Sequence, residues 1–244
     1  MTSLKTLKAP DCIISTVLSS KSVVFETGPP GTSVTVAVLD DLKLGKSSSE
    51  FEEYESSLFE TIRSNNDLES LRHDPLIRSY RALHWSYSMD PTKTRVSSEA
   101  VLRRVLQGEN LWRISNLVDV VNLASAYHKI PIGLVDVSKI QGQLTVRKAR
   151  KGEVFRRIGG EGVECRGREL VLSDDSGIVC YGFAVHDSER TKITRSTRCA
   201  LLLLYGAPYA TEDIMNDATF FTLGAIKRWV DCMISKPVRY AAPA

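Results

Sequence analysis

Two apolar patterns follow one another in the first quarter of the chain. Residues 12–18 (CIISTVL) and 33–39 (SVTVAVL) are rich in β-branched side chains and are separated by the turn sequence GPPG, which predicts two strands. Residues 47–64 instead carry an apolar side chain at every third or fourth position, with serines ahead of the first turn, which predicts a helix. The apolar stripe of that helix consists of Phe51, Tyr54, Leu58 and Ile62.

Three further helices are predicted before the pattern changes. The first covers residues 75–85 and ends before MDPTKTR. The second is SEAVLRRVL, for which Ser97 is the expected N-cap, with Glu99 in the first turn, where the helix dipole favours an acid. The third begins after Ser115 and ends at KIPIG.

From residue 132 the chain alternates between short apolar runs and glycine-rich or charged turns, as in an antiparallel or mixed sheet. The predicted strands are 132–137, 143–149, 169–174, 178–185 and 199–205, and IGGEG at 158–162 is interpreted as a turn. Residues 211–234 predict a closing helix, because Ile214, Ala218, Phe221, Ala225 and Trp229 recur at helical spacing. We therefore expect one α+β domain spanning residues 1–244.

One of these helices carries two polar residues in its apolar stripe. In NLVDVVNLASAYHKIP, residues 116–131, Asp119 and Asn122 are three positions apart and share a helix face. One interpretation is structural: each side chain satisfies a neighbouring buried polar group. The other is that the pair belongs to a functional site.

Composition is that of an ordinary globular protein. Hydrophobic residues make up 43% and charged residues 25% of the 244 positions, and no apolar run reaches the length of a membrane span. The first residues lack the apolar stretch of a secretory signal. Five widely spaced cysteines without a CxxC pair argue against a disulfide framework or a zinc site. We expect a cytoplasmic protein that does not contact membranes.

Charge is distributed unevenly although the net charge is only +3. Acidic residues gather in 49–60, whereas basic residues gather in 92–104, 146–157 and 165–170. Basic clusters on part of a surface can contact phosphates without a high overall charge. The alternative is that these residues are solvated on loops and strand edges, where lysine and arginine are common.

Familiar catalytic motifs are missing from the sequence. There is no HExxH, P-loop or nucleophile elbow, and IGGEG is not a dinucleotide-binding motif. His73, His84, His128 and His186 lack metal-ligand spacing. His186 and Asp187 would point to opposite faces of a strand, and Cys180 and Cys199 fall in apolar strands as small hydrophobic residues. The sequence predicts no metal and no cofactor.

Several motifs occur in a consistent order. They are the VDxxN of Asp119 and Asn122, the P-x-G-x-x-D of Pro131 to Asp136, and the R-x-A-x-x-G-E of Arg147 to Glu153. With DPTKTRVSSEAVLRRVL before them and LVLSDDSGIVC and DSERTKITRSTRCALLLLYG after them, the series resembles the B3/B4 tRNA-editing domain of the phenylalanyl-tRNA synthetase beta subunit, in its freestanding form. The resemblance covers residues 78–206, preceded by an N-terminal part (1–77) and followed by the closing helix (211–234).

The resemblance implies a layered β-sandwich-like core covered by helices, with a pocket that hydrolyses the ester of a mischarged tRNA. An aminoacyl ester is already activated, so such a pocket can act by positioning water without a catalytic triad. No synthetase core or ATP-site signature is found here. We therefore expect a freestanding protein that binds tRNA and edits in trans, with no role for DNA.

The resemblance also assigns residues to the pocket. Asn122 falls at a pocket asparagine and is the expected catalytic residue, with Asp119 holding its helix. The synthetase pattern has threonine at the position of Val121 and histidine at the position of Gly133, and the glycine is expected to leave additional room. Glu189 matches a glutamate that recognises the hydroxyl group of misattached tyrosine.

The other expected pocket residues are Gly133, Asp187, Ser188, Thr191 and Thr197, and the expected RNA contacts are Lys93, Arg95, Arg103 and Arg104. For the hydroxyl groups the alternative is hydrogen bonding within strands, and for the basic residues it is solvation. Two other functions remain open. One is a noncatalytic tRNA- or RNA-binding module, which the departures at Val121 and Gly133 favour. The other is a small-molecule hydrolase or amino-acid-binding protein that reuses the pocket.

Overall fold

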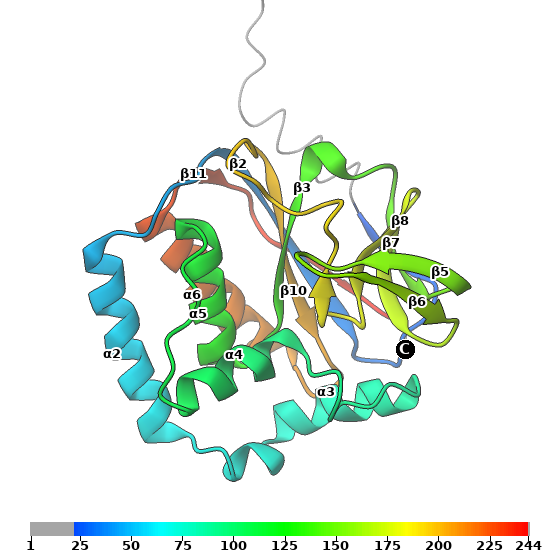
Figure 1. Cartoon of the computed structure of the whole chain (residues 1–244), viewed down its shortest axis with the longest axis horizontal. Helices are drawn as coiled ribbons and strands as arrows, with labels where there is room; N and C mark the ends of the chain where they lie inside the picture. The colour runs from blue at the N-terminus through cyan, green and yellow to red at the C-terminus, as the bar shows by residue number, and fades with distance from the viewer. Residues whose placement is uncertain (1–21, 244) are drawn as a thin grey trace, which may run out of the picture.

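The structure is a computed structural model that describes residues 22–243, and it shows a helical layer beside two β-sheets (Figure 1). This confirms the predicted α+β class. The expected strand at 12–18 lies outside the described residues. Among the described residues, no helix combines the length and the apolar character needed to cross a bilayer.

The first sheet is built around its longest strand, β2 (Ser33–Lys43). On one side β2 pairs with β10 (Ala200–Gly206), which in turn pairs with β3 (Ile132–Asp136). On its other side, β11 (Asp231–Ile234) and β12 (Val238–Ala241) pair with the two halves of β2. All these pairs are antiparallel, and every residue of β3 and β10 is buried, as expected for strands covered on both faces.

The second sheet has the strand order β1-β4-β7-β8-β9. Its strands are β1 (Val23–Phe25), β4 (Leu144–Lys148), β7 (Leu170–Asp174), β8 (Gly177–Tyr181) and β9 (His186–Asp187). Only β1 and β4 run parallel. The hairpin of β5 (Lys151–Arg156) and β6 (Gly162–Arg166), which the sequence pattern did not predict, encloses the correctly predicted turn at 158–162. It shares a small second core with β7 and β8.

The helices gather mainly on one side of the first sheet (Figure 1). They are α2 (Ser49–Asn65), α3 (Pro75–Ser86), α4 (Ser97–Leu106), α5 (Asn116–His128) and α6 (Glu212–Trp229), with short 3-10 turns η1 (Ser70–Arg72) and η2 (Val137–Lys139). Helix α5 packs against α2, α4, α6 and β3. This central position explains why α5 is apolar on most of its surface.

Side-chain caps start most of these helices. Ser48, Asp74, Ser115 and Thr211 each accept a hydrogen bond from a backbone amide of the first turn. The expected cap at Ser97 is wrong: Val96 is the N-cap of α4 and no side chain caps that helix. The Ser97 amide instead donates to the carbonyl of Ala184, 2.9 Å away, so a tertiary contact replaces the local cap.

Two predicted elements end earlier than expected. The strand predicted over 178–185 stops at Tyr181, because Gly182, Phe183 and Ala184 have φ angles of 70°, 49° and 78° and turn the chain back into β9. The closing helix predicted over 211–234 stops at Trp229, and the last residues of that segment form β11 along the open edge of β2. For β8 a local turn therefore sets the end of the strand, whereas for α6 a strand partner distant in sequence sets the end of the helix.

Candidate functional site

Hydrogen bonds account for the position of Asp119, the buried acid of α5. Its Oδ1 accepts from the backbone amides of Ile114 and Ser115, at 2.9 and 3.3 Å, and its Oδ2 accepts from the hydroxyl group of Ser47 at 2.7 Å. The residue is 1% exposed. These bonds hold the start of α5 against the segment that precedes α2. They are sufficient to explain why an acid is buried here, and a catalytic role for Asp119 stays a prediction.

Asn122 follows Asp119 by three residues on α5 and is only partly buried. Within residues 22–243, its carboxamide makes no hydrogen bond. A partly exposed amide without a protein partner keeps its donor and acceptor groups available to water or a ligand. The two polar residues of the helix therefore differ: both oxygens of the Asp119 carboxylate accept hydrogen bonds from the protein, whereas the Asn122 carboxamide makes none with the described residues.

Gly133 does not leave the additional room that the sequence suggested. It lies on β3 opposite Leu203 of β10, and a Cβ atom at this position would lie 3.1 Å from Oδ1 of Asp187 and 3.3 Å from Cε2 of Tyr205. Both distances are tighter than ordinary van der Waals contact. The carboxylate of Asp187 and the ring of Tyr205 therefore occupy the space into which a side chain at 133 would extend.

The tight turn after β8 places Asp187 in this position. Asp187 pairs with Cys180 across β8 and β9, and the amide of Ala184 donates to Sγ of Cys180 at 3.2 Å. Burial raises the pKa of Asp187 to about 6, and hydrogen bonds from the Cys180 thiol and the Leu134 amide only partly offset this effect. The structure thus brings Gly133 and Asp187 together, as predicted, and adds Tyr205, which sequence reasoning missed because its strand is uniformly apolar.

The expected hydroxyl residues line the loop between β9 and β10, and this loop is internally bonded. Thr197 donates to Oδ2 of Asp136 at 2.6 Å and accepts from the amide of Thr194 at 2.9 Å. Ser188 accepts from the amide of Arg190 at 3.3 Å. The hydroxyl of Thr191 is buried and has no partner among the described residues. Thr197 thus has a structural explanation, whereas Thr191 is the hydroxyl left available.

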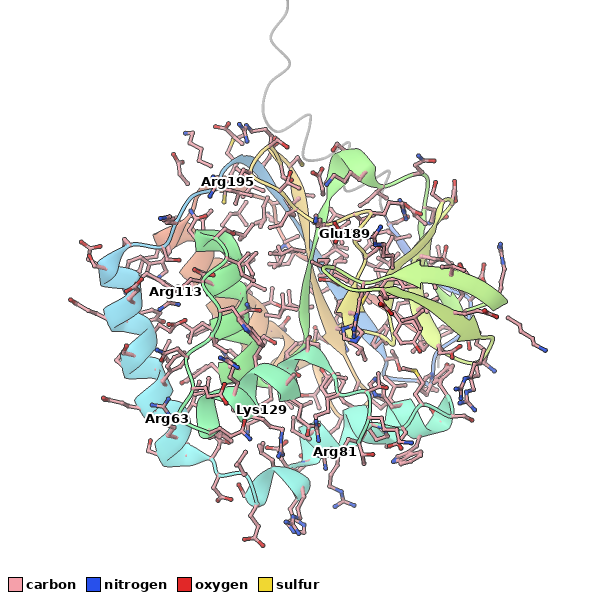
Figure 2. All side chains as sticks on the ribbon, in the orientation of Figure 1. Arg63, Arg81, Arg113, Lys129, Glu189 and Arg195 are labelled. Atoms are coloured by element: carbon pink, nitrogen blue, oxygen red, sulfur yellow. The ribbon has the colours of Figure 1, made fainter. Side chains whose placement is uncertain are left out.

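Glu189 projects from the same loop (Figure 2), and its carboxylate is already paired. Its carboxylate forms an ion pair with Lys192 and accepts from the amide of Gly159 at 3.1 Å. The hydrogen bond from Lys192 is the main reason that the pKa of Glu189 lies below its ordinary value. Glu189 therefore attaches the tip of the β5–β6 hairpin to the loop, and a role in amino-acid recognition stays a prediction.

Three of the four expected RNA contacts line one cavity of about 490 Å³. Lys93, Arg95 and Arg103 surround it together with His186, and no acidic residue of the described part of the chain lines it. His186 points toward this cavity and Asp187 toward Gly133, which agrees with the predicted opposite orientation of the two residues. Burial, then the nearby Arg157, lowers the pKa of His186, which favours a neutral imidazole.

Arg104 does not contribute to this cavity. Its guanidinium donates to the carbonyl of Asn110 at 2.6 Å, forms an ion pair with Glu109 and lies 4.6 Å from the centre of the Trp112 ring. Arg103 and Arg104 are neighbours in sequence, but adjacent helix positions point in directions about 100° apart. We call the cavity lined by Lys93, Arg95, Arg103 and His186 the basic cavity.

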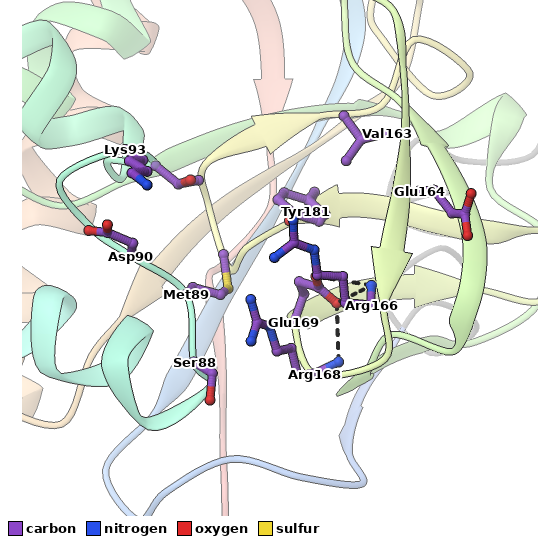
Figure 3. Close-up of a pocket in the computed structure, with 11 residues that line it drawn as sticks. Ser88, Met89, Asp90, Lys93, Val163, Glu164, Arg166, Arg168, Glu169 and Tyr181 are labelled. Atoms are coloured by element: carbon purple, nitrogen blue, oxygen red, sulfur yellow. Dashed lines mark hydrogen bonds between the residues drawn. The ribbon is translucent and has the colours of Figure 1, made fainter.

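A second hollow adjoins the basic cavity at Lys93 and Thr94 (Figure 3). It measures about 380 Å³ and lies between the loop after α3 and the turn from β6 to β7, with Arg166, Arg168 and Tyr181 in its wall. Glu169 is 4% exposed and accepts hydrogen bonds from the amides of Arg166 and Arg168. The basic segment 165–170 was the sequence signal for this hollow, but only the fold places it beside Lys93.

The R-x-A-x-x-G-E motif forms a buried ion pair. The guanidinium of Arg147 binds both oxygens of Glu153, at 2.9 and 2.6 Å, and donates to the hydroxyl of Ser173 at 2.8 Å. The amide of Arg150 also donates to Glu153, at 2.9 Å. The motif therefore closes the link between β4 and β5, with the two charged side chains only 11% and 14% exposed.

The described residues include no group of three or more histidine, cysteine, aspartate or glutamate side chains arranged to hold a metal ion. Cys165, Cys180, Cys199 and Cys232 are free thiols within this part of the chain. Burial raises the pKa of the Cys199 thiol to about 12, which keeps it protonated.

Comparison with known proteins identifies the family. The B3/4 domain family matches residues 79–220, and the chain belongs to this family. The phenylalanine–tRNA ligase beta subunit of Chromobacterium violaceum is 30% identical over 127 residues, which are 52% of this chain and 14% of that protein. The corresponding subunit of Fusobacterium nucleatum is 27% identical over 127 residues, 52% of this chain and 16% of that protein. The chain thus spans about a seventh of the relatives that it matches.

Among solved structures, an N-terminal fragment of the phenylalanyl-tRNA synthetase beta subunit from Pyrococcus horikoshii aligns with 90% of this chain and 55% of that chain, with a TM-score of 0.45 and 12% sequence identity. The family match and the relatives confirm the resemblance predicted from VDxxN, P-x-G-x-x-D and R-x-A-x-x-G-E.

Proposed function

We propose that this chain binds tRNA at the basic cavity and hydrolyses the ester bond of mischarged aminoacyl-tRNA in trans. Membership of the B3/4 family and relatedness to synthetase beta subunits favour an RNA partner. The observation that carries the tRNA proposal is the basic cavity itself, where three cationic side chains converge and, within residues 22–243, no acidic residue lines the wall. Such a surface attracts phosphates and steers their approach.

Binding should depend steeply on salt, and three residues should account for part of that dependence. We expect the Lys93→Gln/Arg95→Gln/Arg103→Gln variant to bind tRNA more weakly and to reduce the slope of log affinity against log salt by about 2 to 3, since each neutralised phosphate contributes about 0.7 to 0.9. Filter binding or fluorescence anisotropy at several salt concentrations measures this slope. The variant removes the 3.7 Å ion pair of Arg95 with Glu99, but Glu99 keeps its bonds to Arg81, at 3.1 and 2.6 Å.

Arg104→Gln is the matched control for the change at Arg103, because it removes one charge from the same helix while Arg104 faces away from the cavity. It should leave the slope nearly unchanged. An unchanged slope in the triple variant would remove the basic cavity from the interface, and an equal loss per charge removed with Arg104→Gln would show that only the total charge matters.

Hydrolysis is proposed to depend on Asn122. Water adds to the ester carbonyl carbon, the bond to the ribose oxygen breaks, and the amino acid and tRNA are released. A carboxamide without a protein partner can orient that water or the ester through one donor and one acceptor. Asp119 would act only by holding α5 in place.

We expect Asn122→Asp to reduce the deacylation of mischarged tRNA by about 10- to 100-fold while leaving the melting temperature almost unchanged, because an amide that makes no protein hydrogen bond contributes little to stability. Asn116→Asp is the control. Asn116 accepts from the amide of Gly45 at 3.0 Å and donates to the carbonyl of Lys43 at 3.3 Å, so this change should lower the melting temperature instead. Rates and melting curves are measured on the same samples, and a purely thermal effect at Asn122 would contradict its catalytic role.

A noncatalytic RNA-binding module is the second candidate. It is favoured by the ion pair of Glu189 with Lys192 and by the filled space at Gly133, which occupy two positions of the expected pocket. The salt-dependent binding predicted above would then persist, and no mischarged tRNA in a panel of amino acids would be deacylated.

A further inference from the structure

A cavity of about 500 Å³ lies at the end of the molecule where α5 begins. Three segments that are far apart in sequence form it: 44–46 after β2, 114–118 at the start of α5, and 193–195 in the loop before β10. Figure 2 shows Arg195 at this end of the fold, beside the ends of β2 and β11. We call this the α5 cavity, and it shares no lining residue with the basic cavity.

Four of the nine residues that line the α5 cavity are aliphatic, and the others are small, hydroxyl-bearing or cationic. Leu44, Ile114, Val118 and Ile193 line it, and Ile114 is 65% exposed. Removing an aliphatic side chain with this exposure from water, by a ligand or partner, lowers the free energy of the system. The cavity therefore favours an apolar body.

The charges at the α5 cavity all have one sign. Lys46 and Arg195 line it, no acidic residue does, and neither cation forms an ion pair within residues 22–243. Asp119 lies behind the lining residues, but its oxygens are occupied by Ile114, Ser115 and Ser47. An aliphatic cavity with two unpaired cations is complementary to a ligand that combines an apolar body with an anionic head.

We propose that the α5 cavity binds a free small carboxylate with an aliphatic body, of the size of a medium-chain fatty acid. The aliphatic chain contacts Leu44, Val118 and Ile193, and the carboxylate lies near Lys46 and Arg195. This site shares no residue with the basic cavity, although Val118 lies one turn before Asn122 on α5.

The test uses the full chain and sodium octanoate, hexanoate and butyrate below micelle-forming concentrations. Titration calorimetry measures affinity, and the methyl resonances of Leu44, Ile114, Val118 and Ile193 locate the binding. We expect one molecule per chain, with affinity rising roughly fourfold for each added methylene group. Octylamine, which has the same body and the opposite charge, should bind at least tenfold more weakly than octanoate.

Variants separate the contribution of the two cations to octanoate affinity from the contribution of the aliphatic side chains. Lys46→Gln and Arg195→Gln should each weaken octanoate binding about threefold, and the double variant about tenfold, as expected for partly exposed ion pairs. Ile193→Ser should reduce the dependence on chain length. Lys227→Gln, an exposed lysine on α6 without an ion pair, is the matched control and should change nothing.

Each outcome decides the proposal. The proposal is supported by saturable octanoate binding that shifts the methyl resonances of the four aliphatic residues, strengthens with chain length and weakens when the cations or the carboxylate are replaced. No binding of octanoate, equal binding of octylamine, or shifts confined to other parts of the chain would overturn it. Loss of tRNA binding in the basic-cavity variant has no bearing on this result, so the two proposals fail separately.

Discussion

Replacing Gly133 with histidine, the residue found at this position in the synthetase pattern, should destabilise the fold by about 3 kcal/mol and should not accelerate the deacylation of mischarged tRNA. The reason is steric. A Cβ atom at position 133 would already lie 3.1 Å from the carboxylate of Asp187 and 3.3 Å from the ring of Tyr205, before any ring atom is added. Chemical denaturation of wild type and variant measures the loss.

Two further variants show whether Asp187 is the obstacle. Gly133→Ala alone should cost about 1 to 2 kcal/mol. Combined with Asp187→Ala it should cost at least about 1 kcal/mol less than the sum of the single changes, because the shorter side chain removes the closest contact. Additive effects would mean that the two residues do not compete for the same space.

Gly224→Ala provides a control of opposite sign. Gly224 lies in α6, and a Cβ atom there would meet nothing within 4 Å. The change should therefore stabilise the protein by about 0.5 to 1 kcal/mol through helix propensity. If Gly133→His retains wild-type stability and deacylates mischarged tRNA faster than wild type, the space at Gly133 is larger than the structure shows.

Breaking the pair of Arg147 and Glu153 should cost about 3 kcal/mol of unfolding free energy. Arg147→Ala removes both hydrogen bonds to Glu153 and the bond to Ser173, and it leaves a carboxylate that is only 14% exposed without its cation. An uncompensated buried charge costs far more than the net value of the pair. Denaturant titration at pH 7 measures the difference from wild type.

The pH dependence of this difference has a definite sign. The hydrogen bond from Arg147 lowers the pKa of Glu153 below its ordinary value of 4.5. The stabilisation is therefore fully present above pH 4.5 and is lost as the pH falls through the lowered pKa in the folded state. Wild type and Arg147→Ala should thus converge in stability in acid.

Lys43→Ala is the control for a surface pair. Lys43 and Asp231 are 2.7 Å apart, but their side chains are 62% and 72% exposed. This change should have only a slight effect, because water screens the charges that it separates. A similar loss in both variants would indicate that Arg147 acts as a surface residue.

Local patterns identified most helices and strands but misplaced their ends. The stripe of Phe51, Leu58 and Ile62 and the caps at Ser48 and Ser115 were visible because they depend on residues three or four positions apart. The end of β8 depends on the turn at 182–184, and the end of α6 depends on β2, which pairs with the residues that follow the helix. The β5–β6 hairpin was missed because its strands are short, charged and exposed on one face.

In the candidate site, too, the sequence identified the residues, whereas their surroundings depended on the fold. The motifs around Asp119, Asn122 and Arg147 were sufficient to indicate the family, which the match over residues 79–220 confirms. The environment of each residue was not available from the motifs. Arg103 and Arg104 are adjacent residues of the same type, and the sequence does not distinguish them, yet only Arg103 lines the basic cavity.

The sequence by itself determined the α+β class, the family and the helix that carries Asp119 and Asn122, because these follow from short-range periodicity and ordered motifs. The tertiary structure alone decided that Asp119 is saturated, that Asp187 and Tyr205 fill the space beside Gly133, and that Lys93 and Arg103 converge on one cavity. The physical reason is that steric exclusion and electrostatic interaction depend on distance in space. The chain brings these residues together from separate strands, helices and loops, and no spacing along the sequence records that proximity.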